Sequence, residues 1–304
     1  MNPEKTTYKG WDNCLKLSNE SVELVVTLDV GPRIISYALT GGKNVFKNYE
    51  EMMGVTAGEE WMIFGGHRLW HAPEDEVRTY APDFGPVESS WEGGVLTLRP
   101  PEEARTGIRK EIEIRLNPHD SGVRVVHRLY NHNLWEVELA PWSLSVMDRG
   151  ARAIVPQEPF GPHPQHLLPA RPLVLWRFTD MSDPRWTWGK GFVQLQQDPA
   201  VESPQKVGMF NSLGWVACAV NDALFVVKTA VSAGKPHADL GVNTELFTNG
   251  DMLEVETLGP LTRIPPGGVA EHTEHWGLFP AKVEKSEESI EQTVLPCVHK
   301  VGDV

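Results

Sequence analysis

The sequence predicts a mainly β fold of antiparallel strands that ends in a short helix. Three observations support this prediction. Apolar and polar residues alternate along the whole chain, clusters of Gly, Pro and Asn separate the alternating stretches, and a helical spacing of apolar residues is convincing only near the C-terminus. Alternation with a period of two places successive side chains on opposite faces of a strand, so one face can be buried while the other is solvated.

Individual strands follow from this alternation. In residues 21–30 (SVELVVTLDV) every even-numbered position is apolar, as expected for a half-buried strand. Residues 111–116 and 123–129 alternate in the same way on either side of the turn sequence NPHDSG, which predicts a hairpin. Further strands are expected at residues 137–146, 192–196, 215–220, 224–229, 253–257 and 270–278.

The helix is expected in residues 285–294 (KSEESIEQTV), where a Ser cap precedes acidic residues and Ile290 and Val294 are four residues apart. No shift of composition between residues 10 and 280 marks a domain boundary. We therefore expect one domain over residues 1–280 and a helical tail over residues 281–304.

A Pro-rich segment, residues 156–172, interrupts the strands. A 17-residue loop without secondary structure of its own is unusual in a compact domain, and such loops are often functional as lids or binding loops. A structural crossover between two sheets explains the segment equally well.

Charge, cysteines and hydropathy exclude several classes of protein. The 28 Lys and Arg against 41 Asp and Glu give a net charge of −13, which repels phosphate backbones, so no nucleic-acid partner is expected. Cys14, Cys218 and Cys297 are too far apart for a disulfide framework or a Cys-based zinc site. The N-terminal MNPEKTTYKG has no apolar leader, and the longest apolar run, Leu213–Val220, has eight residues where a membrane span needs roughly 20. We expect a cytoplasmic protein without a membrane partner.

Common catalytic motifs are also missing from the sequence. It contains no GxSxG, Walker, dinucleotide-binding, HExxH or CxxC pattern, so serine hydrolase, NTPase and dehydrogenase functions lack support and no cofactor is expected. The composition instead includes 11 Trp and 11 His, and several Trp stand next to His, Arg or Glu. Flat aromatic faces beside polar groups suit a polar ligand with apolar faces, such as a sugar.

The densest polar cluster is GGHRLWHAPED, residues 65–75. His67 and His71 have HxxxH spacing, but the preceding glycines and Pro73 disfavour a helix and no Glu follows His67, so no metal ion is expected here. Arg68 could pair with a carboxylate in a structural loop. We favour the alternative that Arg68 binds sugar hydroxyls and Trp70 stacks on the ring, because so many polar and aromatic residues are unusual in a purely structural loop.

A second polar cluster lies in residues 237–250 (HADLGVNTELFTNG). Asp239, Asn243 and Glu245 could present several oxygens to hydroxyls or to calcium. The EF-hand pattern is absent, because Gly241 comes too early and the closing Glu is missing. A loop whose side chains bond their own backbone explains the cluster equally well.

A third cluster lies in the last two predicted strands. Glu254 and Glu256 leave the same face of one strand, where two like charges tend to raise one pKa, as a general acid or base requires. A solvated acidic face is the alternative. His272, Glu274 and Trp276 share a face of the following strand, whereas His127 falls on the apolar side of its strand and is interpreted as a core histidine.

Taken in order, these segments resemble the galactose mutarotase-like superfamily, which includes the aldose 1-epimerases. The resemblance covers roughly residues 8–280 and rests on VELVVTLDVGPRIISYAL, FGGHRLWHAPE, VRVVHRLYNHNLWEVELAPWSLSV and LEVETLGPLTRIPPGG. It implies a large antiparallel β-sandwich, the supersandwich of that superfamily, with Arg68 as a sugar-binding residue and Glu256 as the catalytic glutamate. The set of motifs is most similar to a branch of the superfamily without a settled activity.

The resemblance also implies a mechanism. Mutarotation needs a base for the proton of the anomeric hydroxyl and an acid that protonates the ring oxygen. Glu256 would be the base, but Trp142 stands where the epimerases have an acidic histidine. The acid would then come from His67 or His71, or from His163 and His166 in the long loop, and His67 is expected first.

We therefore expect a carbohydrate-active enzyme of the aldose 1-epimerase type that uses general acid/base chemistry. A neutral sugar is the simpler substrate for a chain of charge −13, although a uronic acid is not excluded. Two alternatives stay open: a non-catalytic carbohydrate-binding protein, motivated by Trp142, and a metal-assisted sugar lyase or isomerase. The expected substrate-binding residues are Arg68, Trp70, His71, Trp142, Asp239, Asn243 and Glu245.

Overall fold

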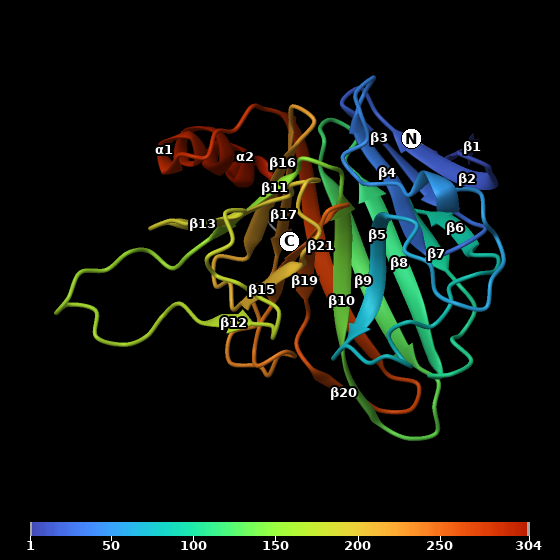
Figure 1. The fold of residues 1–304 in the computed structure, drawn as a ribbon. Coiled ribbons are helices and arrows are strands. Elements are labelled where there is room, and N and C mark those ends of the chain that lie inside the picture. Colours follow the sequence, from blue (N-terminus) through green and yellow to red (C-terminus); the bar gives the residue numbers. More distant parts are fainter. Residues whose placement is uncertain (1, 303–304) are drawn as a thin grey trace.

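Two large antiparallel sheets packed face to face make up the computed structural model, which describes residues 2–302 (Figure 1). Short helices near the C-terminus cover part of one sheet. This architecture confirms the predicted fold class, a mainly β antiparallel sandwich with a short C-terminal helix.

The first sheet has 11 strands. Its central strands are β5, β10 and β19, and β20 pairs with the N-terminal end of β10. In spatial order the strands are β1 (Glu4–Tyr8), β2 (Trp11–Ser18), β3 (Val22–Thr27), β4 (Arg33–Leu39), β5 (Gly66–Ala72), β10 (Val137–Met147), β19 (Leu253–Leu258), β18 (Thr244–Thr248), β15 (Gln205–Met209) and β12 (Leu173–Leu175), with β20 (Thr262–Ile264) beside them.

The second sheet has 10 strands, with β21 and β9 near its centre. In spatial order they are β13 (Trp186–Trp188), β14 (Phe192–Gln196), β11 (Arg152–Pro156), β16 (Trp215–Val220), β17 (Ala223–Thr229), β21 (Val269–Pro280), β9 (Val123–Asn131), β8 (Ile108–Leu116), β7 (Val95–Arg99) and β6 (Glu88–Glu92). The helical segments are η1 (Glu50–Met52), α1 (Glu287–Ser289), η2 (Ile290–Val294) and α2 (Leu295–Lys300).

The predicted strands are confirmed, and one expectation differs from the structure, namely the length of the C-terminal helix. Residues 111–116 and 123–129 form the hairpin of β8 and β9, closed at the pair Leu116 and Val123. However, β9 and β10, which follow each other in sequence, lie in different sheets, because β10 pairs with β5 and β19. The C-terminal helical stretch extends beyond residue 294 to Lys300, since Val298 continues the apolar face of Ile290 and Val294 against the second sheet.

The Pro-rich segment between β11 and β12 contains neither helix nor strand. It projects from the body of the sandwich, where the ribbon in Figure 1 runs yellow-green. Within residues 2–302, none of the helices combines the length and the apolar character that a membrane crossing demands.

The main core lies between the two sheets and contains a cluster of aromatic rings. The Phe225 ring lies 5.3 Å from Trp276, 5.7 Å from Phe46 and 6.0 Å from Tyr37, each time nearly perpendicular to its neighbour. Edge-to-face contacts of this kind stabilise a core beyond the burial of apolar area alone. The cluster joins β4 of the first sheet to β17 and β21 of the second.

Replacing Phe225 with alanine should lower the free energy of unfolding by about 3–5 kcal/mol, because the ring is fully buried and its removal leaves a cavity. Denaturant titration followed by circular dichroism measures the change. Leu134→Ala is the control, since Leu134 is 90% exposed and its loss should cost less than about 0.5 kcal/mol. Equal stabilities of the two variants would contradict the position of this core.

Candidate functional site

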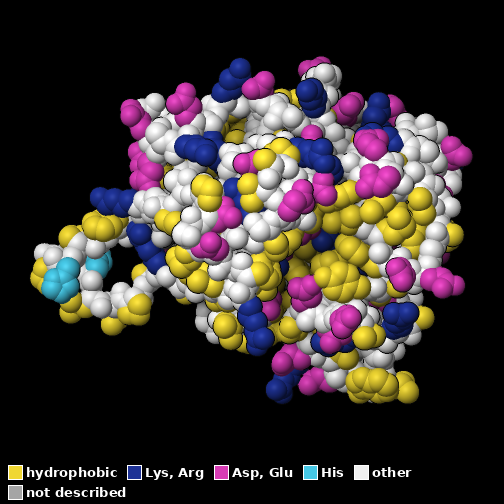
Figure 2. All heavy atoms as spheres, viewed as in Figure 1, with side chains coloured by type: hydrophobic (Ala, Val, Ile, Leu, Met, Phe, Trp, Pro, Cys, Tyr) yellow, Lys and Arg dark blue, Asp and Glu magenta, His cyan; other side chains and the backbone are white. Residues whose placement is uncertain are grey.

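A cavity of about 310 Å³ opens on the outer face of the first sheet, over β5, β10, β19 and β15. Figure 2 shows hydrophobic side chains gathered around a hollow on this face. Its aromatic lining residues are Trp61, Trp70, Tyr80, Trp142, Trp176, Phe178 and Phe247, and its charged lining residues are Arg68, Glu74, Lys206 and Glu254.

Strand register brings these side chains together. Trp142 on β10 lies opposite Trp70 on β5, and Leu144 lies between Arg68 on β5 and Glu256 on β19. Since side chains alternate along a strand, Arg68 and Trp70 point to the cavity face, as do Glu254 and Glu256. The expectation that Glu254 and Glu256 share one face of a strand is therefore confirmed.

The aromatic rings form a continuous apolar wall. The ring centroids of Trp61 and Trp70 are 5.0 Å apart, and those of Trp70 and Trp142 are 5.3 Å apart. The Arg68 guanidinium lies 4.3 Å from the centre of the Trp70 ring and donates from Nη2 to Glu254 Oε1 at 2.8 Å. Such a wall beside charged groups can bind a flat ring that carries hydroxyls.

A buried group of one lysine and two glutamates lies next to this wall. Lys206 Nζ is 2.7 Å from Glu245 Oε2 and 3.3 Å from Glu256 Oε2. The Trp142 indole Nε1 also donates to Glu256 Oε2, at 2.9 Å. Glu245 and Glu256 are fully buried and do not line the cavity. They contact it only through Lys206 and Trp142, which do line it.

The two buried carboxyl groups face each other across neighbouring strands. Glu245 and Glu256 are directly opposite on β18 and β19, and each has one oxygen close to Lys206 Nζ. Burial raises the pKa of both groups, while the positive charge of Lys206 partly lowers it. Burial alone would lower the pKa of Lys206, but the Glu256 and Glu245 carboxylates raise it above its ordinary value. Lys206 is therefore charged at neutral pH and lies against two carboxyl groups whose pKa burial raises.

Arg68 keeps hydrogen-bonding capacity for a ligand. Its Nε and Nη1 atoms are buried and have no hydrogen-bond partner within residues 2–302. Buried polar groups normally find a partner, so an acceptor such as a sugar hydroxyl would satisfy them.

His67 and His71 lie away from this cavity. They flank Arg68 and Trp70 on β5, so alternation turns them to the face between the sheets. His67 contacts Ser145 and His127 there, and burial holds its pKa well below the ordinary value. His71 Nε2 is 3.2 Å from Glu103. The structure thus does not bring either histidine to the cavity, and a neutral, buried His67 is unsuited to protonate a ligand there.

The remaining expected site residues, Asp239, Asn243, His163 and His166, do not line the cavity. Asp239 is close enough to Glu245 for their charges to interact, and burial raises the pKa of Asp239. Asn243 instead exchanges hydrogen bonds with the backbone of Asn211 and supports the loop structure. His163 and His166 are exposed on the projecting loop.

Lys206, Trp61, Trp176 and Tyr80 are lining residues that the sequence analysis does not identify. Lys206 belongs to the strand sequence QKVGM, where Val207 and Met209 face the core. A lysine on the opposite face is expected to be solvated. Only the tertiary structure shows that this face is covered, because Lys206 Nζ lies 4.9 Å from the centre of the Trp142 ring and 4.7 Å from that of the Trp176 ring.

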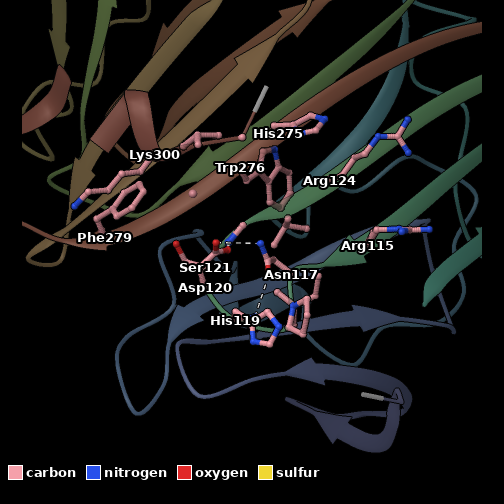
Figure 3. Close-up of a pocket in the computed structure, with 17 residues that line it drawn as sticks. Arg115, Asn117, His119, Asp120, Ser121, Arg124, His275, Trp276, Phe279 and Lys300 are labelled. Carbon is pink, nitrogen blue, oxygen red and sulfur yellow. Dashed lines mark hydrogen bonds between the residues drawn. The ribbon is translucent and has the colours of Figure 1, made fainter. Parts of the chain in front are cut away.

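A larger hollow of about 720 Å³ lies at the second sheet, beside the β8–β9 turn and the end of α2 (Figure 3). Asp120 is the sole carboxylate among the described residues that line it. That carboxylate accepts hydrogen bonds from Asn117 and Gly122 of its own turn. The cavity on the first sheet is the better candidate site, because its lining combines a continuous wall of aromatic rings with both acidic and basic side chains.

No family model matches the sequence, and neither does any curated protein. Solved structures do match the fold. Slr1438 protein from Synechocystis sp. PCC 6803 matches with a TM-score of 0.58 and 12% identity, over 92% of this chain and 98% of that one. A galactose mutarotase-like protein from Lactobacillus casei ATCC 334 matches with a TM-score of 0.56 and 11% identity, over 88% and 100% of the two chains.

A TPR-domain containing protein from Parabacteroides distasonis ATCC 8503 matches with a TM-score of 0.60 and 13% identity over 89% of this chain. The match covers 48% of that protein, so this chain spans about half of its length. Other matched structures are of mutarotase-like and aldose 1-epimerase-like proteins. Identities this low show the fold alone. The chain therefore has the galactose mutarotase-like fold, in agreement with the resemblance of its sequence motifs.

Proposed function

We propose that the chain is a carbohydrate-active enzyme that interconverts the anomers of a sugar by general acid/base chemistry, in the manner of an aldose 1-epimerase. The observation that carries the proposal is the juxtaposition, in one aromatic-lined cavity, of a carboxylate on the wall and a charged lysine held by two buried carboxyl groups. These groups are Glu254, Lys206, and Glu245 with Glu256.

Glu254 and Lys206 are the groups that can reach a sugar in the cavity. Glu254 takes the proton of the anomeric hydroxyl, the bond between C1 and the ring oxygen breaks, and the ring oxygen takes a proton from Lys206. Rotation about the C1–C2 bond and the reverse transfers close the ring as the other anomer, so no proton is gained or lost overall. This assignment differs from the expectation that Glu256 is the base, because Glu256 lies behind Lys206 and Trp142.

Glu256 then acts as a positioning residue. Together with Glu245 it holds Lys206 in place and provides the negative charge that keeps the lysine protonated. The apolar faces of Trp70 and Trp142 contact the sugar ring, and Arg68 donates to its hydroxyls. The lining holds two carboxylates and two cations, and Glu245 and Glu256 lie behind it, so acidic groups outnumber cations and a neutral sugar is favoured over a uronic acid.

A non-catalytic sugar-binding protein is the second candidate. It is favoured by one observation, namely that Glu254 and Lys206 are both already paired, with Arg68 and with the buried glutamates. It predicts saturable binding of a sugar without any acceleration of anomer exchange.

Replacing Glu254 with glutamine should reduce anomer exchange by at least about 100-fold at every pH, because the variant has lost its general base. Magnetisation-transfer NMR with glucose, galactose, mannose, fucose and their uronic acids measures this rate. Glu88→Gln, at an exposed position on β6, is the matched control and should retain the wild-type rate. Full exchange in Glu254→Gln would show that Glu254 is not the base.

Glu256→Gln separates a positioning role from a catalytic one in the same assay. We expect a partial loss of exchange together with a changed pH profile, because Lys206 has lost one of its two carboxylates. A loss as complete as that of Glu254→Gln, without any change in the pH profile, would make Glu256 the base.

Replacing Lys206 with methionine should make stability more sensitive to rising pH. A carboxyl group whose pKa is raised in the folded state stabilises the fold at low pH, and this contribution is lost as the pH rises through the folded pKa. Without Lys206 the pKa of the Glu245–Glu256 pair rises further. Between pH 5 and pH 8, the unfolding free energy of Lys206→Met should therefore fall by more than that of wild type. The extra fall is about 1.4 kcal/mol for each unit by which the substitution raises the pKa of the pair.

Urea unfolding at the two pH values measures this difference. Lys43→Met, at an exposed turn position, is the control and should follow the wild type. If the unfolding free energy of Lys206→Met changes with pH as that of wild type does, the charge of Lys206 does not affect the pKa of the two carboxyl groups.

A further inference from the structure

A second polar cluster lies between the two sheets, directly behind the strands that carry the cavity residues. It contains His67 on β5, His127 on β9 and Glu274 on β21, all buried. His67 adjoins Arg68 in the sequence, so the cluster and the cavity occupy opposite faces of the same strand. The proposed function uses none of these three residues.

Three ligand atoms converge in this cluster. His67 Nε2 is 2.7 Å from His127 Nε2 and 3.8 Å from Glu274 Oε2, and all three atoms lie within 4.8 Å of one another. A tetrahedral zinc site with bonds of 2.0–2.2 Å places its ligand atoms about 3.3 Å apart. The two imidazole nitrogens would need to separate by roughly 0.6 Å and the carboxylate oxygen to approach by a similar amount.

The hydrogen bonds of the histidines fit ligand roles. His127 Nδ1 faces the backbone oxygen of His272 at 3.1 Å, so this nitrogen donates and the neutral ring has its lone pair on Nε2. His67 Nδ1 faces the Ser145 hydroxyl at 2.9 Å, and a hydroxyl can accept as well as donate. A shift of one proton from Nε2 to Nδ1 of His67 therefore turns a second lone pair toward the same point. A partner on the other ring nitrogen is typical of histidines that bind metals.

Glu274 is also held in a manner that suits a ligand. Its Oε1 accepts from Ser143 Oγ at 2.5 Å and from Thr257 Oγ1 at 2.6 Å, and its Oε2 accepts from Trp276 Nε1 at 2.8 Å. Of the salt-bridge contacts within residues 2–302, the single one of Glu274 is with His67, so no lysine or arginine pairs with this carboxyl group.

We propose that His67, His127 and Glu274 bind one divalent transition-metal ion of the zinc class. Two imidazoles and one carboxylate are a ligand set that zinc accepts, and the three ligand atoms already converge on one buried point. The ion would join β5 of the first sheet to β9 and β21 of the second, and so fix the strand that carries Arg68 and Trp70. This proposal departs from the expectation of no metal, which considered His67 only together with His71.

The metal content of the full-length protein tests the proposal. The protein is expressed with added zinc, dialysed against metal-free buffer and analysed by inductively coupled plasma mass spectrometry. We expect about one zinc per chain in the wild type, and at least a tenfold loss in His127→Gln and in Glu274→Gln. His71→Gln is the matched control, since His71 is a buried histidine on the same face of β5 outside the cluster, and it should retain the metal.

Cobalt provides a readout that does not depend on the folding of the variants. Wild-type protein refolded with Co²⁺ should show the visible absorption bands of a four-coordinate site with nitrogen and oxygen ligands. Wild-type protein that retains no zinc and shows no such bands would overturn the proposal and leave the cluster as a hydrogen-bonded network. Undiminished zinc in a folded His127→Gln variant would also overturn it, because the ion would then be bound elsewhere.

Discussion

The central strands of the first sheet are buried on both faces, and this constraint determines both polar clusters. Alternation sends neighbouring residues of β5 into different environments, Arg68 and Trp70 toward the cavity and His67 and His71 between the sheets. Buried polar groups are costly unless they are paired. Each face of these strands therefore carries a hydrogen-bonded cluster of its own, and the two clusters lie back to back.

The cavity combines this burial with an unusual charge arrangement. Lys206 is charged because two carboxyl groups lie behind it, and the carboxyl groups tolerate burial because they face Lys206. The same arrangement supplies a proton donor at the edge of an aromatic wall. Trp142 thus does not replace the missing histidine but holds Glu256, while a lysine takes the place of the acid in the proposed chemistry.

Alternation in the sequence predicts the strands, the hairpin of β8 and β9 and the common face of Glu254 and Glu256, because these depend on local periodicity. Alternation does not reveal which outer faces of a sheet are covered. From the sequence alone, Lys206 is therefore expected to be a surface residue. Nor does a dense cluster such as GGHRLWHAPED show that its side chains point to opposite faces of a sheet. That conclusion follows only when the segment is known to be a strand. The contact of His67, His127 and Glu274 joins three distant segments and depends entirely on the packing of the two sheets.

The position of the site on the first sheet is the central claim, and a crystal structure of the complex with a neutral sugar tests it most directly. We predict a ring stacked on Trp70 and Trp142, with its anomeric hydroxyl about 3 Å from Glu254 and its ring oxygen facing Lys206. A sugar bound at the hollow beside β21, or a ring in the cavity whose anomeric carbon points away from both groups, would contradict it.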